Sequence, residues 1–312
     1  MSVEISMKTI LLVTGLTTIA TLLMAQDAPV PHSPVPVIVT VEARHGKDVP
    51  LLTREDFLAY ERKDRVQVMD VLPLQGEHAG LELFILIDDS SSSSLGLQLD
   101  DLRQFIQGQP ATTAIGIGYM SNGTFNIAQN FTADHSQAAQ RLRLPLSSFG
   151  VMASPWLSLG DLIKRWPGNS VRREVILVSS GVDQLGGLGS TNPYLDIAIE
   201  AAQRSGIVVY AIYTPGAGHA GHSMWGMNWA QNHLAQLAEE TGGESYMLGF
   251  GEPVSFRPYL AGIAERLSHQ YRVTLDLKAG NKAGFQAVRF VTEVPNAELV
   301  GASKVFVPAS GH

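Results

Sequence analysis

The stretch FILIDDSSSSSLG, residues 84–96, joins an apolar run directly to two aspartates and five serines. A segment that is apolar at nearly every position, here starting at residue 81, predicts a strand buried on both faces of a parallel sheet. The polar residues behind it predict a loop beyond the carboxyl end of that strand, where open α/β sheets bind their ligands. This junction therefore predicts both a fold class and the place of a site.

Strands and helices alternate around this junction. Further strands are predicted at 114–120, 124–131, 173–180, 207–213 and 244–248, with helices marked by apolar residues at 99–105, 157–166, 193–205, 230–238 and 256–267. Asn192 and Pro193 occupy the N-cap and first-turn positions of one helix, and Gly206 ends it. The alternation predicts an α/β core with a doubly wound, mostly parallel sheet, Rossmann-like in its layering.

Two β-rich segments flank this core. Before it, alternation begins at Val37, Thr53 is placed to cap a short helical turn, and residues 65–72 form a strand. After it, strands are predicted at 271–277, 284–294 and 303–309. The sequence permits these flanks to pair into one small sheet.

The first residues predict export from the cytoplasm. Lys8, the apolar run 10–24 and Ala25 fit a signal peptide over 1–25, although an uncleaved anchor is the alternative because Leu23 is a poor residue before a cleavage site. The expected order is then a Pro-rich linker at 26–36, a β-rich lead-in at 37–78, the core at 79–268 and a C-terminal β segment at 269–312. No membrane span is expected beyond the signal segment.

Composition narrows the functional classes. The 312 residues carry a formal net charge of −7 and show no Lys/Arg-rich run, so no nucleic-acid partner is expected. Cysteine is absent, which excludes disulfides and thiol chemistry. The chain has neither a G-x-S-x-G elbow nor a phosphate-binding G-x-x-x-x-G-K-[ST] loop, and we expect no enzyme.

The serine-rich loop has the composition of a site for a hard cation. Asp88, Ser90 and Ser92 read D-x-S-x-S, and hydroxyls two residues apart in a tight loop can face one ion. Asp89 with Ser91 and Ser93 satisfies the same pattern. Asp88 is preferred because it directly follows the apolar strand.

A strand followed by D-x-S-x-S and a helix resembles a von Willebrand factor type A domain. The segments LLTREDFLAYE (51–61), REVILVSSGVD (173–183) and GIAERLSHQYRVTL (262–275) resemble the VWFA-related proteins of the acidobacterial type. The resemblance runs from about Val37 to Val307. It implies a type A core and a metal-ion-dependent adhesion site, at which a partner's Glu or Asp completes the coordination of a divalent ion.

The resemblance also implies two further loops at this site. Ser154 stands where the family has a threonine, with Ser158 as a weaker candidate. Ser180 replaces the aspartate of the family's T-D-G loop, which leaves the site degenerate, and Asp183 is an uncertain outer member that would act through a water. Mg²⁺ is the expected ion, with Mn²⁺ or Ca²⁺ as alternatives, and binding by so few carboxylates is expected to be weak.

A loop before the 230–238 helix supplies the expected partner-binding residues. Trp225 is expected to be an exposed aromatic anchor beside His222, with residues 184–191 as a further part of the rim, while Trp229 is expected to pack inward. Zinc binding by His219, His222 and His233 is a weaker hypothesis. The expected function is protein binding; the alternatives are a metal-free structural or assembly scaffold of the cell envelope and, less favoured, a serine hydrolase.

Overall fold

The computed structural model describes residues 31–46, 48–147, 152–166, 172–187, 189–217 and 224–310. The signal segment predicted at 1–25 lies outside these ranges. Among the helices within them, none is both long and apolar enough to cross a membrane.

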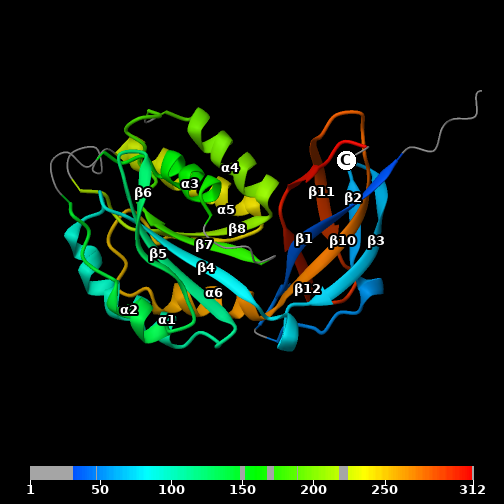
Figure 1. Cartoon of the computed structure of the whole chain (residues 1–312), viewed down its shortest axis with the longest axis horizontal. Coiled ribbons are helices and arrows are strands. Elements are labelled where there is room, and N and C mark those ends of the chain that lie inside the picture. The colour runs from blue at the N-terminus through cyan, green and yellow to red at the C-terminus, as the bar shows by residue number, and fades with distance from the viewer. Residues whose placement is uncertain are drawn as a thin grey trace, which may run out of the picture. The chain divides into compact units, whose positions relative to one another are not determined.

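A six-stranded sheet forms around the apolar run that starts at Leu81 (Figure 1). Strand β4 (Leu81–Asp88) pairs in parallel with a neighbour on each side, and only the edge strand β6 runs antiparallel. The sheet order is β6 (Thr124–Thr132), β5 (Thr113–Ser121), β4, β7 (Arg173–Ser179), β8 (Ile207–Tyr213) and β9 (Ser245–Tyr246). The mixed α/β class predicted from the sequence is confirmed.

Helices cover both faces of this sheet. Leu83, Ile85 and Ile87 of β4 belong to one hydrophobic cluster, whereas Phe84 and Leu86 belong to another. Because side chains alternate across a strand, the two clusters lie on opposite faces. The first cluster contains residues of α1 (Leu99–Gln107), α2 (His135–Gln140) and α6 (Arg257–Ser268), and the second contains residues of α3 (Pro155–Lys164), α4 (Pro193–Ser205) and α5 (Met224–Thr241) (Figure 1).

The ends of α4 form as their sequence predicts. The Asn192 side chain accepts hydrogen bonds from the backbone N–H groups of Tyr194 (3.0 Å) and Leu195 (3.3 Å). Gly206 follows the helix with a φ of 62°, a left-handed conformation in which glycine carries no steric penalty. These two caps fix where α4 starts and where β8 begins.

The two flanks pair into one seven-stranded antiparallel sheet. Its members come from both sides of the core in the sequence, and their inward side chains form a hydrophobic core of their own. The order is β12 (Ala297–Gly301), β1 (His32–Ala43), β10 (Gln270–Lys278), β3 (Asp64–Pro73), β2 (Leu58–Glu61), β11 (Gly284–Val291) and β13 (Lys304–Val307). Short 3₁₀ turns lie at Arg54–Asp56, Gly76–His78 and Ser93–Gln98. The short elements β2, β12 and α2 were not predicted.

The start of β1 corrects the predicted linker. The strand begins at His32, so residues 32–36 belong to the sheet and not to a Pro-rich spacer. Val41 N donates to His269 O on the β10 side, and alternation along the strand therefore directs the nitrogens of Pro34 and Pro36 to the other side. On that side β12 pairs only from Val39 onward, so both prolines lie where no ladder hydrogen bond is lost.

A buried polar network joins the two sheets. Arg172, which is 3% exposed, donates through Nε to Glu174 (3.0 Å) and to Gln270 Oε1 (2.8 Å). Gln270 in turn donates to the Tyr210 hydroxyl (3.0 Å). Glu174 and Tyr210 lie on β7 and β8, whereas Gln270 opens β10. The fully buried Glu174 carboxylate thus has its charge and hydrogen-bond partners supplied from both sheets.

We expect Arg172→Ala to lower the free energy of unfolding by about 3–5 kcal/mol, because it leaves the buried carboxylate of Glu174 without its cation. Urea denaturation monitored by circular dichroism measures this. Arg103→Ala is the matched control, since it removes a surface ion pair with Asp100, whose side chain is 81% exposed, and should cost less than about 1 kcal/mol. Equal losses in the two variants would contradict the structural role of this network.

Candidate functional site

The serine-rich loop begins at the carboxyl end of β4 and rests against the segment that follows β8. Ser92 N donates to Pro215 O (2.9 Å), and Ala217 N donates to Ser90 O (2.8 Å). Ser91 forms an isolated β-bridge with Gly216. The loop is therefore held by backbone contacts on the side of β8, at the edge of the sheet that the sequence predicted for a site.

Asp88 is the centre of the hydroxyl cluster. Its Oδ1 accepts from the backbone N (2.9 Å) and hydroxyl (2.6 Å) of Ser90, and its Oδ2 accepts from the Ser179 hydroxyl (2.7 Å). The side chain is nearly inaccessible, with the residue 2% exposed. Asp88 and Ser90 thus lie in direct contact, while their service as metal ligands stays a prediction. Ser179, at the end of β7, is a contact that no sequence motif indicated.

Burial raises the pKa of the Asp88 carboxyl, because the charged form loses its hydration. The hydrogen bonds from Ser90 and Ser179 oppose this shift without cancelling it, and the neighbouring charge of Asp89 adds to it. Among the described residues, no cation forms an ion pair with Asp88. The Asp88 carboxylate is buried and is held only by hydroxyls and one backbone amide. A cation placed beside it would therefore stabilise its charged form.

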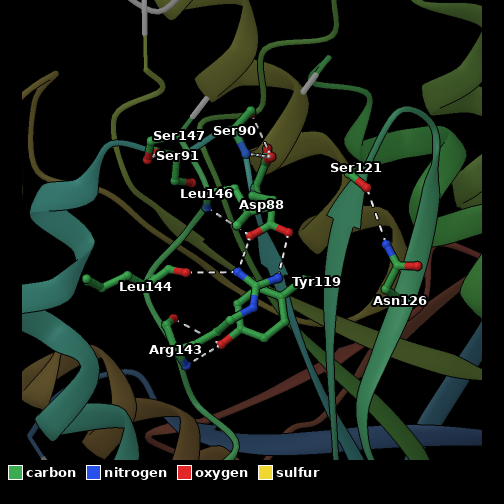
Figure 2. A network of polar contacts seen from close by, with 11 residues as sticks. Asp88, Ser90, Ser91, Tyr119, Ser121, Asn126, Arg143, Leu144, Leu146 and Ser147 are labelled. Carbon is green, nitrogen blue, oxygen red and sulfur yellow. Dashed lines mark hydrogen bonds and ion pairs between the residues drawn. The ribbon is translucent and has the colours of Figure 1, made fainter. Parts of the chain in front are cut away.

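Asp89 has the opposite environment, although it is the next residue. Its carboxylate forms a bidentate ion pair with Arg143, at 2.6 Å to Nη1 and 2.7 Å to Nη2. Figure 2 labels this arginine beside Tyr119. The guanidinium lies 3.7 Å from the centroid of the Tyr119 ring, and the Tyr119 hydroxyl accepts from Arg143 N (2.7 Å). Asp89 is thereby satisfied within the fold. The alternative reading of the motif, starting at Asp89, is thus the weaker one, and Ser93 of that reading is exposed.

Ser92 leads to a second carboxylate that the sequence analysis missed. The Ser94 hydroxyl donates to Glu252 Oε2 (2.6 Å). Its one proton is used there, so the Ser92 hydroxyl, 2.8 Å away, is the donor in the bond between the two serines. Glu252 also accepts from the Thr214 hydroxyl (3.3 Å). Glu252 lies between β9 and α6, more than 150 residues from the loop in sequence, and no motif marks it.

Ser154 lies at the N-terminus of α3, as the resemblance implies. It is 3% exposed, and its hydroxyl oxygen has no hydrogen-bond partner among the described residues. The hydroxyl of Ser158, the weaker candidate, instead donates to Ser154 O (2.9 Å) inside the helix. The neighbouring Ala153 N donates to Gln184 Oε1 (3.0 Å), which ties this turn to the loop after β7. Ser154 therefore keeps a buried acceptor and donor free for another group.

The polar side chains of the loop after β7 form hydrogen bonds within the loop. The Ser180 hydroxyl accepts from Val182 N (3.3 Å). The Asp183 carboxylate accepts from Leu185 N and Gly186 N (both 3.0 Å) and from Asn192 Nδ2 (2.9 Å). Asp183 accordingly orders this loop and joins it to the cap of α4. Its role as an outer ligand of a metal ion, acting through a water, stays a prediction.

The aromatic and histidine predictions have separate outcomes. Trp225, in the first turn of α5, is 81% exposed, as expected for an anchor. Trp229 is half-buried. His219 and His222 lie outside the described residues. His233 is buried and has Nε2 3.4 Å from Ser190 O, with its ring 6.3 Å from that of Trp156.

Large apolar side chains are exposed on the loops around this site. Some lie in the segments or first helical turns that follow β4, β7, β8 and β9. The others lie in the segment before α3, which hydrogen-bonds to Asp89 and Asn122 beyond the ends of β4 and β5. They are Leu97, Leu144, Leu146, Met152, Leu185, Met224, Trp225, Leu248 and Val254. We refer to these nine residues as the apolar rim. Only Leu51, Met69, Ile127 and Ile197 are comparably exposed elsewhere in the described part of the chain.

The donors at the site are suited to a hard cation, but carry little charge. The Ser90 hydroxyl donates a hydrogen bond to Asp88 and keeps its oxygen lone pairs for another group. The Ser154 hydroxyl has no partner among the described residues, and Asp88 supplies one buried carboxylate. In the described ranges, no group of three or more His, Cys, Asp and Glu residues is placed to hold a metal ion. The donor set therefore fits at most a weakly held divalent ion.

Comparisons with known proteins leave the family open. No protein-family model matches the chain, and no curated protein matches it. Similar solved structures include an aerotolerance-related membrane protein from Bacteroides fragilis (14% identity, 60% of this chain and 98% of that chain, TM-score 0.45) and BatB from Bacteroides thetaiotaomicron (16%, 61% and 98%, 0.42). The SpRpn10 VWA domain is similar at 12% identity over 53% of this chain and 85% of that chain, with a TM-score of 0.36. At these values the likenesses assign neither family nor function.

We expect Asp88→Asn to be at least as stable as the unmodified protein at pH 8, because it removes a buried charge while keeping the side chain's shape. A carboxyl whose pKa is raised on folding binds its proton more readily in the folded state. The contribution of Asp88 to stability therefore increases as the pH falls from above its raised pKa toward about 4, its pKa in the unfolded chain.

The measurement is the difference in free energy of unfolding between the protein and Asp88→Asn, by urea denaturation at pH 8, 6.5 and 5. Taking the difference removes the contributions of other carboxyls, such as Asp101 and Asp161, whose lowered pKa values act in the opposite direction. The advantage of the Asn variant should shrink as the pH falls. An advantage that grows with acid would show that Asp88 is stabilised as an anion.

Proposed function

We propose that this chain is an exported protein-interaction module with a von Willebrand factor type A core, which binds its partner at the carboxyl edge of the six-stranded sheet. The observation that carries the proposal is the position of the apolar rim. It surrounds the Asp88 hydroxyl cluster, so apolar contact area and a polar centre occupy one edge of the molecule.

The sheet order supports the type A assignment. Counted from β4, the strands lie in the order 3-2-1-4-5-6, with the third strand antiparallel. The D-x-S-x-S residues start at the end of the central first strand. Ser180 directly follows the neighbouring strand β7, and Ser154 caps the N-terminus of α3. Ligands of open α/β sheets bind at the point where the strand order reverses, which here lies beside β4.

The apolar rim supports protein binding over catalysis. Exposed apolar side chains gathered on one face mark interaction sites, and a Trp is among the residues that contribute most to interface energies. None of the described histidines contacts a serine of the 90–94 loop, so a base for serine chemistry is not supplied there. The hydrolase alternative predicts that a fluorophosphonate labels one of these serines.

Asp88, Ser90, Ser92 and Ser154 are the residues that would hold a divalent ion, Mg²⁺ or else Mn²⁺ or Ca²⁺. When bound, such an ion would offer an open coordination position to a carboxylate of the partner. Asp88 keeps the Ser90 and Ser179 hydroxyls oriented, and Glu252 holds the next part of the loop through Ser94. With one carboxylate at the centre, we expect a dissociation constant in the roughly millimolar range.

The alternative is a metal-free scaffold of the cell envelope that uses the same edge. In that case the Asp88 cluster orders the loop, and the apolar rim alone selects the partner. The two possibilities differ in one property, the dependence of stability and partner binding on divalent ions.

We expect 10 mM Mg²⁺ to raise the melting temperature of the protein above its value in EDTA, because a ligand that binds only the folded state stabilises it by mass action; at about ten times the dissociation constant the gain is roughly 1.4 kcal/mol. Asp88→Ala should abolish the shift. Asp100→Ala, which removes an exposed carboxylate on α1, should retain it. A protein that melts identically with Mg²⁺, Mn²⁺, Ca²⁺ and EDTA would exclude the ion and leave the metal-free scaffold.

The rim is tested by site-specific photo-crosslinking in cells that produce the chain. A photoreactive amino acid at Trp225 (81% exposed) is expected to give a discrete adduct with one partner. The same amino acid at Leu51, which is 90% exposed but lies outside the rim, is the control and should give none of that adduct. Identical adducts from both positions would argue against the carboxyl edge as the binding surface.

A further inference from the structure

A cavity of about 680 Å³ lies away from the Asp88 cluster, at the opposite edge of the six-stranded sheet. Its walls come from the amino ends of β7 and β8, the end of α4, and strands β1, β10 and β13. This volume falls in the range of sites for small organic ligands. The proposed partner-binding function makes no use of it.

The cavity is lined by cations and by no acid. Arg173, Arg204, Arg272 and Lys304 line it, and among its described lining residues there is neither Asp nor Glu. This is unexpected in a chain whose net charge is −7. Two acidic residues share a sheet face with Arg272: Asp70 on the neighbouring strand β3 and Asp276 on β10 itself. Neither lines the cavity.

Two of these cations have unused hydrogen-bonding capacity. Arg272 lies half-buried on β10, and within the described ranges its side chain has neither an ion pair nor a hydrogen bond. Arg173 donates through Nη2 to Ser205 O, its Nε is buried without a partner, and within the described ranges its Nη1 makes no hydrogen bond and is the group left for a ligand. Unpaired buried donors are costly, and guanidinium donors match the oxygens of a carboxylate or phosphate.

The other two cations are occupied. Arg204 packs its guanidinium over the Phe306 ring at 4.1 Å from the centroid, and Lys304 lies 3.8 Å from a Glu240 carboxylate oxygen. They contribute positive charge without offering a free site. Arg272 and Arg173 are therefore the residues that would contact an anion.

The remaining wall is largely apolar. Pro34, Pro36 and Ile38 project from one face of β1, and Val208 and Phe306 add to the surface from β8 and β13. An inorganic anion would leave this surface unused. A ligand with an anionic head and an apolar body satisfies both parts of the lining.

We infer that this cavity is a binding site for an amphipathic organic anion. Arg272 and Arg173 hold its head group, and the face of β1 with Phe306 packs against its body. The head group is a carboxylate or a phosphate, since both present the oxygens that a guanidinium binds.

Isothermal titration calorimetry of the full chain with decanoate, decyl phosphate and decanol tests the inference. Decanoate or decyl phosphate is expected to bind with one-to-one stoichiometry, and whichever binds more tightly identifies the head group. Decanol has the same apolar body without the charge and should bind about tenfold more weakly or not at all. Failure of both anions to bind, or equal binding by decanol, would overturn the inference.

Variants assign the binding to the cavity. Arg272→Gln should weaken the anion about tenfold while leaving the binding of decanol unchanged, because it removes a charge-assisted hydrogen bond. Arg44→Gln makes the same substitution at an exposed position outside the cavity and should bind like the unmodified protein. This comparison also separates the cavity from nonspecific uptake by the apolar run 10–24.

A second variant keeps the test decisive if Arg272→Gln fails to fold. Thr274→Phe fills the cavity from β10 and should abolish the binding of all three probes, with a melting curve that confirms folding. Anion binding that survives both Arg272→Gln and Thr274→Phe would place the site elsewhere and overturn the assignment.

Discussion

The parallel pairing of β4 with a strand on each side is the constraint on which the rest of the molecule depends. It requires apolar side chains on both faces, and these seed the two hydrophobic clusters against which the helices pack. It also restricts the charged residues of the site to the carboxyl end of the strand and the loop that follows. The aspartates therefore emerge together with the ends of β5, β7 and β8, and loops far apart in the sequence meet at one edge.

Two consecutive carboxylates at this edge show how strongly local environment decides chemistry. Asp89 forms an ion pair with the guanidinium of Arg143, which in turn packs on the ring of Tyr119. Asp88 has only hydroxyls and an amide, and burial raises its pKa. The fold neutralises the charge of Asp89 and leaves the Asp88 carboxylate without a cation among the described residues. A loop needs only the first for stability, whereas a ligand site also needs the second. Arg143 thus positions the serine-rich loop without belonging to the ligand set.

Much of the fold could be predicted because its signals are local. The β4 run, the Asn192 cap and Gly206 each act through neighbouring residues, and they mark the elements correctly. The contacts that complete the site are not local. Arg143 lies in an irregular segment and Glu252 in a distant loop, and neither has a spacing that marks it. Similarly, β12 and α2 are too short to show periodicity. The predicted start of β1 lies too late in the chain, because prolines usually indicate a linker and not a strand.

Those prolines have a further consequence for the exposed margin of the seven-stranded sheet. Along residues 32–38, β1 has β10 on one side and no paired strand in the described chain on the other. Such a margin ordinarily templates the addition of a foreign strand, and with it aggregation. At Pro34 and Pro36 the missing N–H groups are the ones that would face an incoming chain, so a second strand would meet acceptors with no matching donors. The margin is thereby protected from self-association at the same residues that form one wall of the cavity.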